Sequence, residues 1–285
     1  MIIGVDLGNY ATKTSKGVNF TSKVAKTDNI LDSSIALTTM DGTFYMEEGS
    51  YNTEYRKIKK EYIKEMFLAA VAMSTDEINN QICVGLPLSQ YKEDKNAFKE
   101  LLLKDRMQNI GLNGIERKLI IEDIEVYPEG IAALINKEFN GVIVDIGGRT
   151  TDIALLENKK VKKPYSLPIG TLNLYSDFIK MVNSKYALDL KADDAPRLIK
   201  NGLKIYGEDR NIGFALDIFK SYVEGLVNEL QVGYSIKTLD IMLVGGGAIM
   251  LHKAFKNRIP NVQLIEDSIF ANSRGFKKRG ESIWL

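Results

Sequence analysis

Two segments of the sequence repeat one pattern of acidic, glycine and hydroxyl residues. The segments "MIIGVDLGNYATK" (1–13) and "VIVDIGGRTTD" (142–152) each run from apolar residues into an aspartate, a glycine and a threonine. A shift of 139 positions aligns Asp6 with Asp145, Gly8 with Gly147 and Thr12 with Thr151. One such segment alone is typical of a turn between two strands. Two segments at matching positions indicate that two similar turns form one site.

A pair of such turns has the chemistry to bind a metal–nucleotide complex. Backbone N–H groups of a turn bind phosphate oxygens, and glycine lets the phosphate approach the backbone closely. Asp6 and Asp145 would repel a polyphosphate, but Mg²⁺ binds carboxylates and phosphates together. Lys13 and Arg149 would add positive charge beside the phosphates. The repeat therefore predicts a site for phosphates and Mg²⁺ between the two turns.

A third glycine segment, "LVGGGAIML" (243–251), reads as a strand that ends in a tight turn at the start of a helix. The turn alone would explain the glycines, whereas a functional interpretation packs this backbone against a nucleotide beside the helix dipole. It is not a dinucleotide-binding motif, because Met250 stands where the third glycine is required. A Walker A sequence is also absent.

The segment "EVYPEGIAAL" (125–134) predicts a helix that begins near Pro128, with Glu129 in its first turn. Proline and acidic residues are favoured there, and this explains both without a function. Between two phosphate-binding turns, however, Glu129 would be placed to orient a water molecule towards a γ-phosphate. Gly130, Ala132 and Ala133 are small enough to let this helix pass close to another.

The elements that must position these residues alternate between strands and helices. We expect strands at 2–7, 11–16, 18–24, 33–39, 43–49, 81–86, 116–126, 141–146, 151–156, 161–168, 239–244 and 262–265. We expect helices at 59–75, 93–108, 171–185, 192–201, 212–236 and 268–278, besides one that begins within each of the segments 125–134 and 243–251. Each half is thus a three-strand meander followed by alternating helices and strands, which predicts an α/β protein of two similar domains around a cleft.

Composition excludes several classes of protein. Lys and Arg number 38 and Asp and Glu 37, so coating nucleic acid is not the expected task. The only cysteine, Cys83, and the only histidine, His252, exclude a disulfide framework, a Cys/His zinc site and a Cys–His dyad. We expect Cys83 to be buried and His252 to lie on a helix. No signal peptide or membrane span is indicated, so we expect a cytoplasmic protein without membrane partners.

Taken together, these motifs resemble the actin/Hsp70/sugar-kinase superfamily. "VDLGNYATK" is similar to its first phosphate loop, "VYPEGIAAL" to its first connecting helix, "VDIGGRTTDI" to its second phosphate loop and "LVGGGA" to its adenosine segment. The order and spacing match over essentially the whole chain. The opening segment and "FANSRGFKKRGE" (270–281) most resemble bacterial plasmid-segregation actins of the ParM and AlfA type. The resemblance implies an actin-like, ribonuclease H-like fold of two pseudo-symmetric domains.

The resemblance also implies roles for individual residues in binding ATP or ADP, with GTP or GDP as an open alternative. Asp6 and Asp145 would hold Mg²⁺ through water molecules, and Glu129 would position the attacking water, with Asp145 also in the catalytic group. Phosphates and nucleoside would be held by the following residues: Gly8, Asn9, Tyr10 and Ala11; Gly147, Gly148, Arg149 and Thr150; and Gly245, Gly246, Gly247 and Ala248. Gly170 would turn beside the ribose. Arg197 and Lys200 would flank the base, or simply form a solvated helix face.

The expected domains are 1–138, with a C-terminal helix (268–285) that packs back on it, and 139–267. Little chain separates the helices near 186 and 212, so the upper subdomain of the second domain should be reduced or absent. The leading hypothesis is a filament-forming ATPase that segregates plasmid DNA through a DNA-binding adaptor of the ParR type. The basic cluster Arg274, Lys277, Lys278 and Arg279 would be solvated, or serve bundling or the adaptor. A small-metabolite kinase and a non-hydrolysing scaffold of the same fold remain alternatives.

Overall fold

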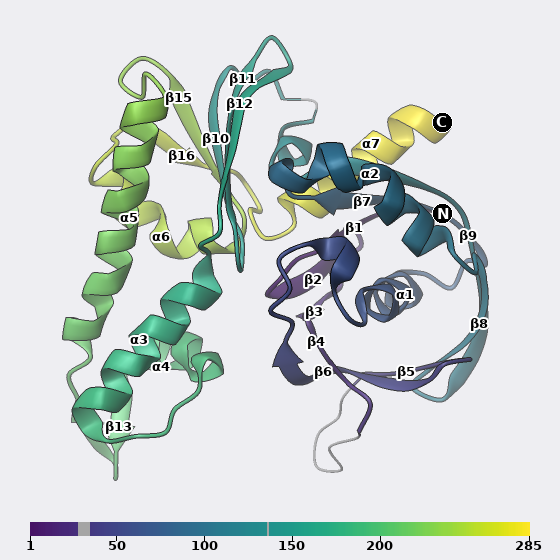
Figure 1. Cartoon of the computed structure of the whole chain (residues 1–285), viewed down its shortest axis with the longest axis horizontal. Helices are drawn as coiled ribbons and strands as arrows, with labels where there is room; N and C mark the ends of the chain where they lie inside the picture. The colour runs from purple at the N-terminus through teal and green to yellow at the C-terminus, as the bar shows by residue number, and fades with distance from the viewer. Residues whose placement is uncertain (28–34, 136) are drawn as a thin grey trace.

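Two β-sheets, one from each half of the chain, dominate the structure (Figure 1). This computed structural model describes residues 1–27, 35–135 and 137–285. Residues 33 and 34 of the strand predicted at 33–39 lie outside the described residues. The expectation of an α/β protein with strands and helices in alternation is confirmed.

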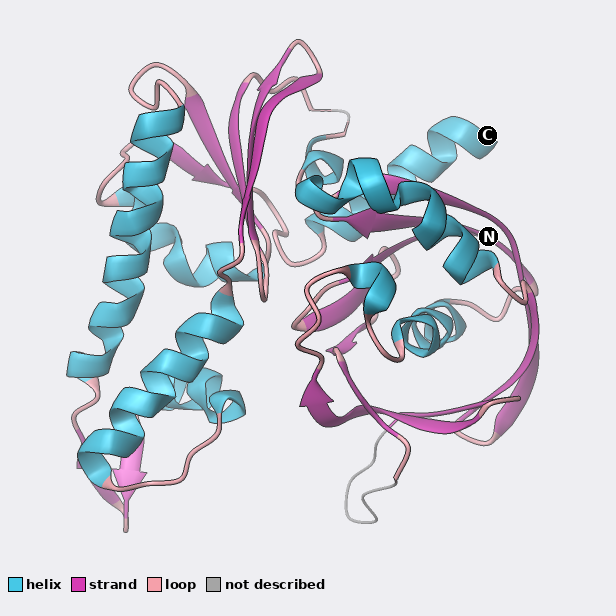
Figure 2. Cartoon of the chain, in the orientation of Figure 1, coloured by secondary structure: helices cyan, strands magenta, loops and turns pink. Residues whose placement is uncertain are grey.

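The described part of the first half forms a nine-stranded sheet in the order β3-β2-β1-β7-β9-β8-β5-β6-β4. Its strands are β1 (Ile2–Leu7), β2 (Ala11–Thr14), β3 (Asn19–Thr21), β4 (Lys23–Ala25), β5 (Ile35–Thr39), β6 (Gly42–Tyr51), β7 (Asn79–Leu86), β8 (Met107–Leu112) and β9 (Ile115–Pro128). The sheet curls around α1 (Ile63–Ser74), whose apolar residues are almost entirely buried (Figure 2). The other long helix of this half is α2 (Leu88–Leu103).

The two faces of β7 pack against different helices because side chains alternate along a strand. Ile82 and Val84 belong to the core that includes α1 and α2. Cys83 faces the other way, where it meets Phe276 of α7 (Ala271–Trp284). Burial raises the pKa of the Cys83 thiol, so the residue acts as a small apolar side chain, as predicted. The C-terminal helix thus covers the back of the first sheet.

The second half repeats the core of this arrangement. Its sheet has the order β12-β11-β10-β15-β16, with β10 (Gly141–Ile146), β11 (Thr151–Glu157), β12 (Lys160–Leu167), β15 (Asp240–Val244) and β16 (Val262–Leu264). In both halves the first strand pairs antiparallel with the second and parallel with a later strand, β7 or β15. The helices are α3 (Thr171–Tyr186), α4 (Ala195–Asn201), α5 (Gly213–Gly233) and α6 (Gly246–Lys256), and His252 lies on α6 as predicted.

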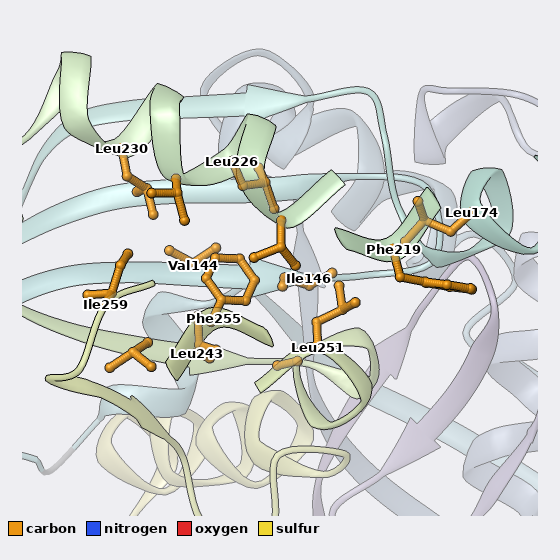
Figure 3. Close-up of a cluster of buried hydrophobic side chains, with 14 of the residues drawn as sticks. Val144, Ile146, Leu174, Phe219, Leu226, Leu230, Leu243, Leu251, Phe255 and Ile259 are labelled. Carbon is orange, nitrogen blue, oxygen red and sulfur yellow. The ribbon is translucent and has the colours of Figure 1, made fainter. Parts of the chain in front are cut away.

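One face of the second sheet packs against α3, α5 and α6 (Figure 3). Val144 and Ile146 of β10 contribute to this core, together with Phe219 of α5 and Phe255 of α6. Ile143, which lies between Val142 and Val144 of this core, points to the opposite face. There it joins the 3₁₀ helix η2 (Ile131–Leu134) and the start of α7 in a smaller apolar cluster. This cluster packs η2 of the first half against β10 of the second half.

The prediction of a helix that is entered through "YPEG" is wrong. β9 continues to Pro128, which pairs with the end of β7, and only the single 3₁₀ turn η2 follows. Gly130 adopts φ of 71°, a left-handed conformation that interrupts the backbone between strand and turn. Glu129 is therefore held at the carboxyl end of a central strand, where an α-helical dipole does not act on it. The small residues nevertheless permit a close approach, because Ala132 packs directly against Gly275 of α7.

Most other boundaries differ by a few residues, but β8 was not predicted, because the helix was expected to continue to 108 and the next strand to begin at 116. The strand expected at 18–24 is divided into β3 and β4. α2 begins five residues before the predicted 93, and the helix predicted at 192–201 starts as a 3₁₀ turn, η3 (Ala192–Asp194), before α4. Between α3 and α5 the chain forms only η3, α4 and a short hairpin of β13 (Leu203–Ile205) and β14 (Glu208–Arg210). Among the described residues, no helix has the length and apolar character needed to cross a bilayer. The division into domains at residue 138 stays a prediction.

Candidate functional site

A cavity of about 360 Å³ lies where the two repeated turns meet. Each turn follows the first strand of its sheet, and the equivalent pairing of these strands places both at the same cleft. The cavity brings together most of the predicted site residues, namely Asp6, Gly8, Asn9, Tyr10, Ala11, Lys13, Glu129, Asp145, Gly147, Gly148, Thr150, Gly245, Gly246 and Gly247.

The first turn is fixed by hydrogen bonds from outside the turn itself. The Ser22 hydroxyl donates to the carbonyl oxygen of Gly8 over 2.7 Å. The ammonium of Lys60 donates to the side-chain oxygen of Asn9. Lys13 lies opposite Asp6 in the strand register, and its Nζ is 3.4 Å from Asp6 Oδ2. The acid of this turn therefore already has a cationic partner.

The second turn closes on itself and touches the first. The N–H of Gly147 donates to the carbonyl oxygen of Thr150 over 2.9 Å. A Cβ on Gly148 would lie 2.8 Å from the backbone nitrogen of Tyr10, so only glycine permits this contact between the turns. Asp145 receives a hydrogen bond of 2.8 Å from the Asn272 amide of α7, and Asp152 lies opposite it in the register.

Four carboxylates surround one end of the cavity, and their charge is only partly compensated. Burial raises the pKa of Asp145 to about 7, and the charges of Glu129, Asp152 and Asp6 add to this rise, whereas the Asn272 hydrogen bond opposes it. Burial also raises the pKa of Asp152. A bound cation would offset this charge.

The donor set fits Mg²⁺ that is held jointly with phosphate. Mg²⁺ retains several water molecules and needs only one or two carboxylates besides substrate phosphates. In the parts of the chain that the structure describes, no group of three or more acidic, cysteine or histidine residues is arranged as a complete metal site. Asp6 and Asp145 on the two turns are thus suited to a metal that enters with its nucleotide.

Glu129 reaches the cavity from the end of β9 and is paired with a buried lysine. Its side chain is 12% exposed, and its carboxylate accepts a hydrogen bond from Lys57 of the 3₁₀ helix η1 (Lys57–Lys59). Burial raises the pKa of Glu129 to about 7, although the Lys57 charge opposes this. Such a carboxylate is poised to accept or orient a proton near neutral pH.

Comparison with known proteins identifies the families and structures to which this chain is similar. Residues 4–131 match the family model described as "Actin like proteins N terminal domain", and residues 125–201 match the "Ppx/GppA phosphatase family". An archaeal actin homologue from Thermoplasma volcanium is 26% identical, with 76% of each chain covered. The structure of an archaeal actin homologue in complex with ADP aligns with a TM-score of 0.83 at 20% identity, covering 99% of both chains.

The chain has an actin-like fold. A 15-stranded ParM filament from Clostridium botulinum also shares it, with a TM-score of 0.77 at 20% identity over 99% of both chains. The resemblance predicted from the ordered motifs is therefore confirmed, including the likeness to ParM-type proteins. The pseudo-symmetric cavity occupies the cleft of this actin-like fold.

From the Gly245 turn, which borders Asp145, the cavity wall continues with apolar side chains of α6 and α3. Gly245 adopts φ of 91°, and a Cβ there would lie 2.5 Å from a carboxylate oxygen of Asp145, so the strand-to-helix turn requires glycine. Ile249 and Met250 on α6 line the same cavity, as does Tyr175 of α3. These side chains offer an apolar surface of the kind that binds a nucleoside.

Five predicted residues do not line the cavity: Arg149, Gly170, Ala248, Arg197 and Lys200. Gly170 packs closely against the second turn, since a Cβ there would lie 2.5 Å from the backbone of Gly148. Arg197 forms an ion pair with Asp194 one helical turn earlier, over 2.9 Å. Arg197 is therefore on a solvated face of α4 and does not flank the cavity. The basic cluster on α7 is likewise engaged, with Arg274, Lys277 and Arg279 paired to Asp267, Glu281 and Glu125.

An aromatic cluster at the edge of the cavity was not anticipated from the sequence. The rings of Tyr10 and Tyr51 stack at 5.5 Å between centroids, and Tyr175 meets Tyr10 edge-on at 6.1 Å. Beside them Lys23 of β4 forms an ion pair of 2.8 Å with Asp193 of η3. The Tyr10–Tyr175 and Lys23–Asp193 contacts cross from the first half of the molecule to the second. We call them the bridge.

Four further residues of the site were also missed. Asp152 could have been found, because the shift of 139 positions aligns it with Lys13, which we had singled out. Lys57 and Lys60 gave no signal, since "RKIKKEYIKE" reads as the solvated start of a helix. Asn272 lies 127 positions from the aspartate to which it donates.

Proposed function

We propose that the protein is a filament-forming nucleotide hydrolase that binds Mg-ATP, or Mg-GTP, in the cavity between the two turns. The observation that supports this most directly is the placement of Glu129 and Asp145 at one end of a cavity whose walls are glycine turns. In a relative of the same fold the nucleotide is ADP. We take the same ligand class for this chain, with the domain division proposed at residue 138.

Each part of the site has a role in this proposal. The backbone of Gly8 to Ala11 and of Gly147 to Thr150 holds the phosphates, and Gly245 to Gly247 face the nucleoside. Asp6 and Asp145 hold Mg²⁺, which offsets the charge of the phosphates when bound. Glu129 orients the attacking water towards the terminal phosphate. Little covalent chemistry falls to the protein in such a reaction, because positioning and charge neutralisation stabilise its loose transition state.

Assembly is the second part of the proposal. A head-to-tail contact between identical chains does not close and therefore produces a filament. The likeness to a ParM filament supports this mode of assembly. We further propose that the filament moves plasmid DNA in the cytoplasm through a DNA-binding adaptor of the ParR type. The net charge of +1 supports indirect contact with DNA.

Light scattering and pelleting after addition of Mg-ATP or Mg-GTP, with phosphate release followed in parallel, test this proposal. We expect scattering that rises on addition of triphosphate and decays as phosphate appears, with Mg-ADP and EDTA samples as controls. Turnover without polymer would favour a metabolite kinase of the same fold. Polymer without turnover would favour a non-hydrolysing scaffold.

A further inference from the structure

Three lysines lie close together on η1 and at its C-terminal end, and they have different environments. Lys57 and Lys60 are buried, with 1% and 6% of their surface exposed, whereas Lys59 between them is exposed. The segment is anchored to α2, because the Lys57 N–H donates to Gln90 and the preceding Arg56 pairs with Asp94. The burial of two cations here is therefore imposed by the fold.

Lys57 and Lys60 differ in how their charges are compensated. Lys57 has the carboxylate of Glu129 as its partner. Across the described residues, Lys60 has no acidic group within ion-pairing distance, and it donates only to the neutral Asn9. Burial and the charge of Lys57 lower the pKa of Lys60 to about 7, and the charge of Arg149 adds to this, whereas the charges of Glu129 and Glu54 oppose it. A buried ammonium without a counter-charge is costly, and it is expected where an anion binds.

The position of Lys60 identifies the anion. Asn9, to which it donates, lines the cavity in the first turn. Lys57, three residues earlier, pairs with Glu129, so Lys60 lies near the end where Glu129 reaches the cavity. The nucleoside end, with Gly246 and Met250, is formed by α6. The anion nearest to Lys60 is therefore the phosphate farthest from the nucleoside.

We propose that Lys60 binds the terminal phosphate of a nucleoside triphosphate and so distinguishes the triphosphate from the diphosphate. This inference rests on the proposed function. The Lys60 ammonium exchanges the Asn9 oxygen for a phosphate oxygen, or donates to both, since lysine carries three donors on a flexible stem. The backbone of η1 stays fixed through Gln90 and Asp94. When a diphosphate is bound, no phosphate oxygen compensates the charge of the Lys60 ammonium.

Isothermal titration with Mg-ADP and with the Mg complex of a non-hydrolysable imido analogue of ATP tests this assignment. We expect Lys60→Met to weaken binding of the analogue by ~10-fold or more, because a charge-assisted hydrogen bond is lost. Binding of Mg-ADP should change less than about twofold. The matched control is Lys59→Met, which removes the adjacent, exposed lysine and should leave both affinities unchanged.

Equal losses for both nucleotides in Lys60→Met, or no loss for either, would overturn the inference. If Lys60→Met does not fold, as judged by thermal melting, Lys60→Gln retains a donor to Asn9 without charge and should show the same selective loss. Lys60→Arg retains the charge and should keep part of the preference for the triphosphate. A wild-type protein that binds neither nucleotide would instead refute the proposed function, so the two failures are distinguishable.

Discussion

Lys13 and Asp152 occupy equivalent positions in the two halves, each directly opposite the aspartate of its turn, and they carry opposite charges. In the first half Lys13 compensates Asp6 at 3.4 Å. In the second half the carboxylate of Asp152 adds to the rise in the pKa of Asp145. The backbone of the site is therefore symmetric, whereas its uncompensated negative charge lies on the side of the second half.

Glu129→Gln should abolish most phosphate release while leaving nucleotide binding and assembly intact. The amide keeps the size of the side chain but cannot accept a proton or orient water as a carboxylate does, so we expect a loss of about 100-fold or more. Phosphate release measured beside pelleting checks this result. Glu122→Gln, on the exposed side of β9, is the control and should behave as wild type. Unchanged phosphate release in Glu129→Gln would show that this carboxylate does not act in hydrolysis.

The nucleotide-free protein should lose stability between pH 5 and pH 7 through Asp145. The pKa of its carboxyl is about 7 when folded, whereas an aspartate in an unfolded chain titrates near ~4, so the folded state alone retains the proton in this window. Both states are protonated well below about pH 4 and both are ionised well above about pH 7. We therefore expect the free energy of unfolding to fall as pH rises through the window, by on the order of 2 kcal/mol from this group.

Urea unfolding at pH 5 and at pH 7 measures this difference. Asp145→Asn should remove the contribution, because the amide does not titrate. Asp41→Asn, at an exposed turn, should retain the wild-type pH dependence. An unaltered pH dependence in Asp145→Asn would contradict the assignment.

Weakening the bridge should accelerate nucleotide release. Lys23→Met removes the ion pair to Asp193, which joins the halves. A partly exposed ion pair contributes about 1 kcal/mol at most, so we expect release to be up to ~5-fold faster. Stopped-flow fluorescence with a labelled diphosphate measures the rate. Lys26→Met is the matched control, since Lys26 lies over Phe44 and Tyr62 within the first half. Equal rates in the two variants would mean that the bridge does not limit release.

The contact between α7 and η2 should be intolerant of a single methyl group. A Cβ on Gly275 would lie 1.9 Å from the Ala132 carbonyl oxygen, so Gly275→Ala requires the backbone to shift and should cost about 1–3 kcal/mol or more. Gly225→Ala, in the interior of α5, meets nothing within 4 Å and should stabilise the protein by up to ~1 kcal/mol. Chemical denaturation of both variants checks the opposite signs. Equal stability of Gly275→Ala and wild type would contradict the packing described.

Local pattern was sufficient to predict the repeated turns, since their residues are adjacent in the chain. Asp6 and Gly8, for example, lie within three positions of the chain. Together they indicate where the strand ends and where a ligand can approach the backbone closely. The environment of Glu129 was not predictable in the same way. Pro128 favours a helix start, but pairing with β7 extends the strand and overrides this preference.

Contacts between distant segments account for the other differences. Lys60 resembles any solvated lysine in sequence, and only the packing of η1 against α2 and the first turn buries it.

Arg197 had the charge required of a base-flanking residue. Its pairing with Asp194, however, is a local contact that keeps it on the solvated face of α4.

The position of α7 also sets an order of events while the chain is being made. Gly4 of β1 lies against Ser273, so this contact of β1 cannot form until α7, which is synthesised much later, has emerged from the ribosome. Domains generally fold as units, and the back of the first sheet cannot be covered before Phe276 emerges. Asp145 likewise gains its Asn272 partner only then. Nascent chains should therefore remain unable to capture nucleotide until α7 has emerged.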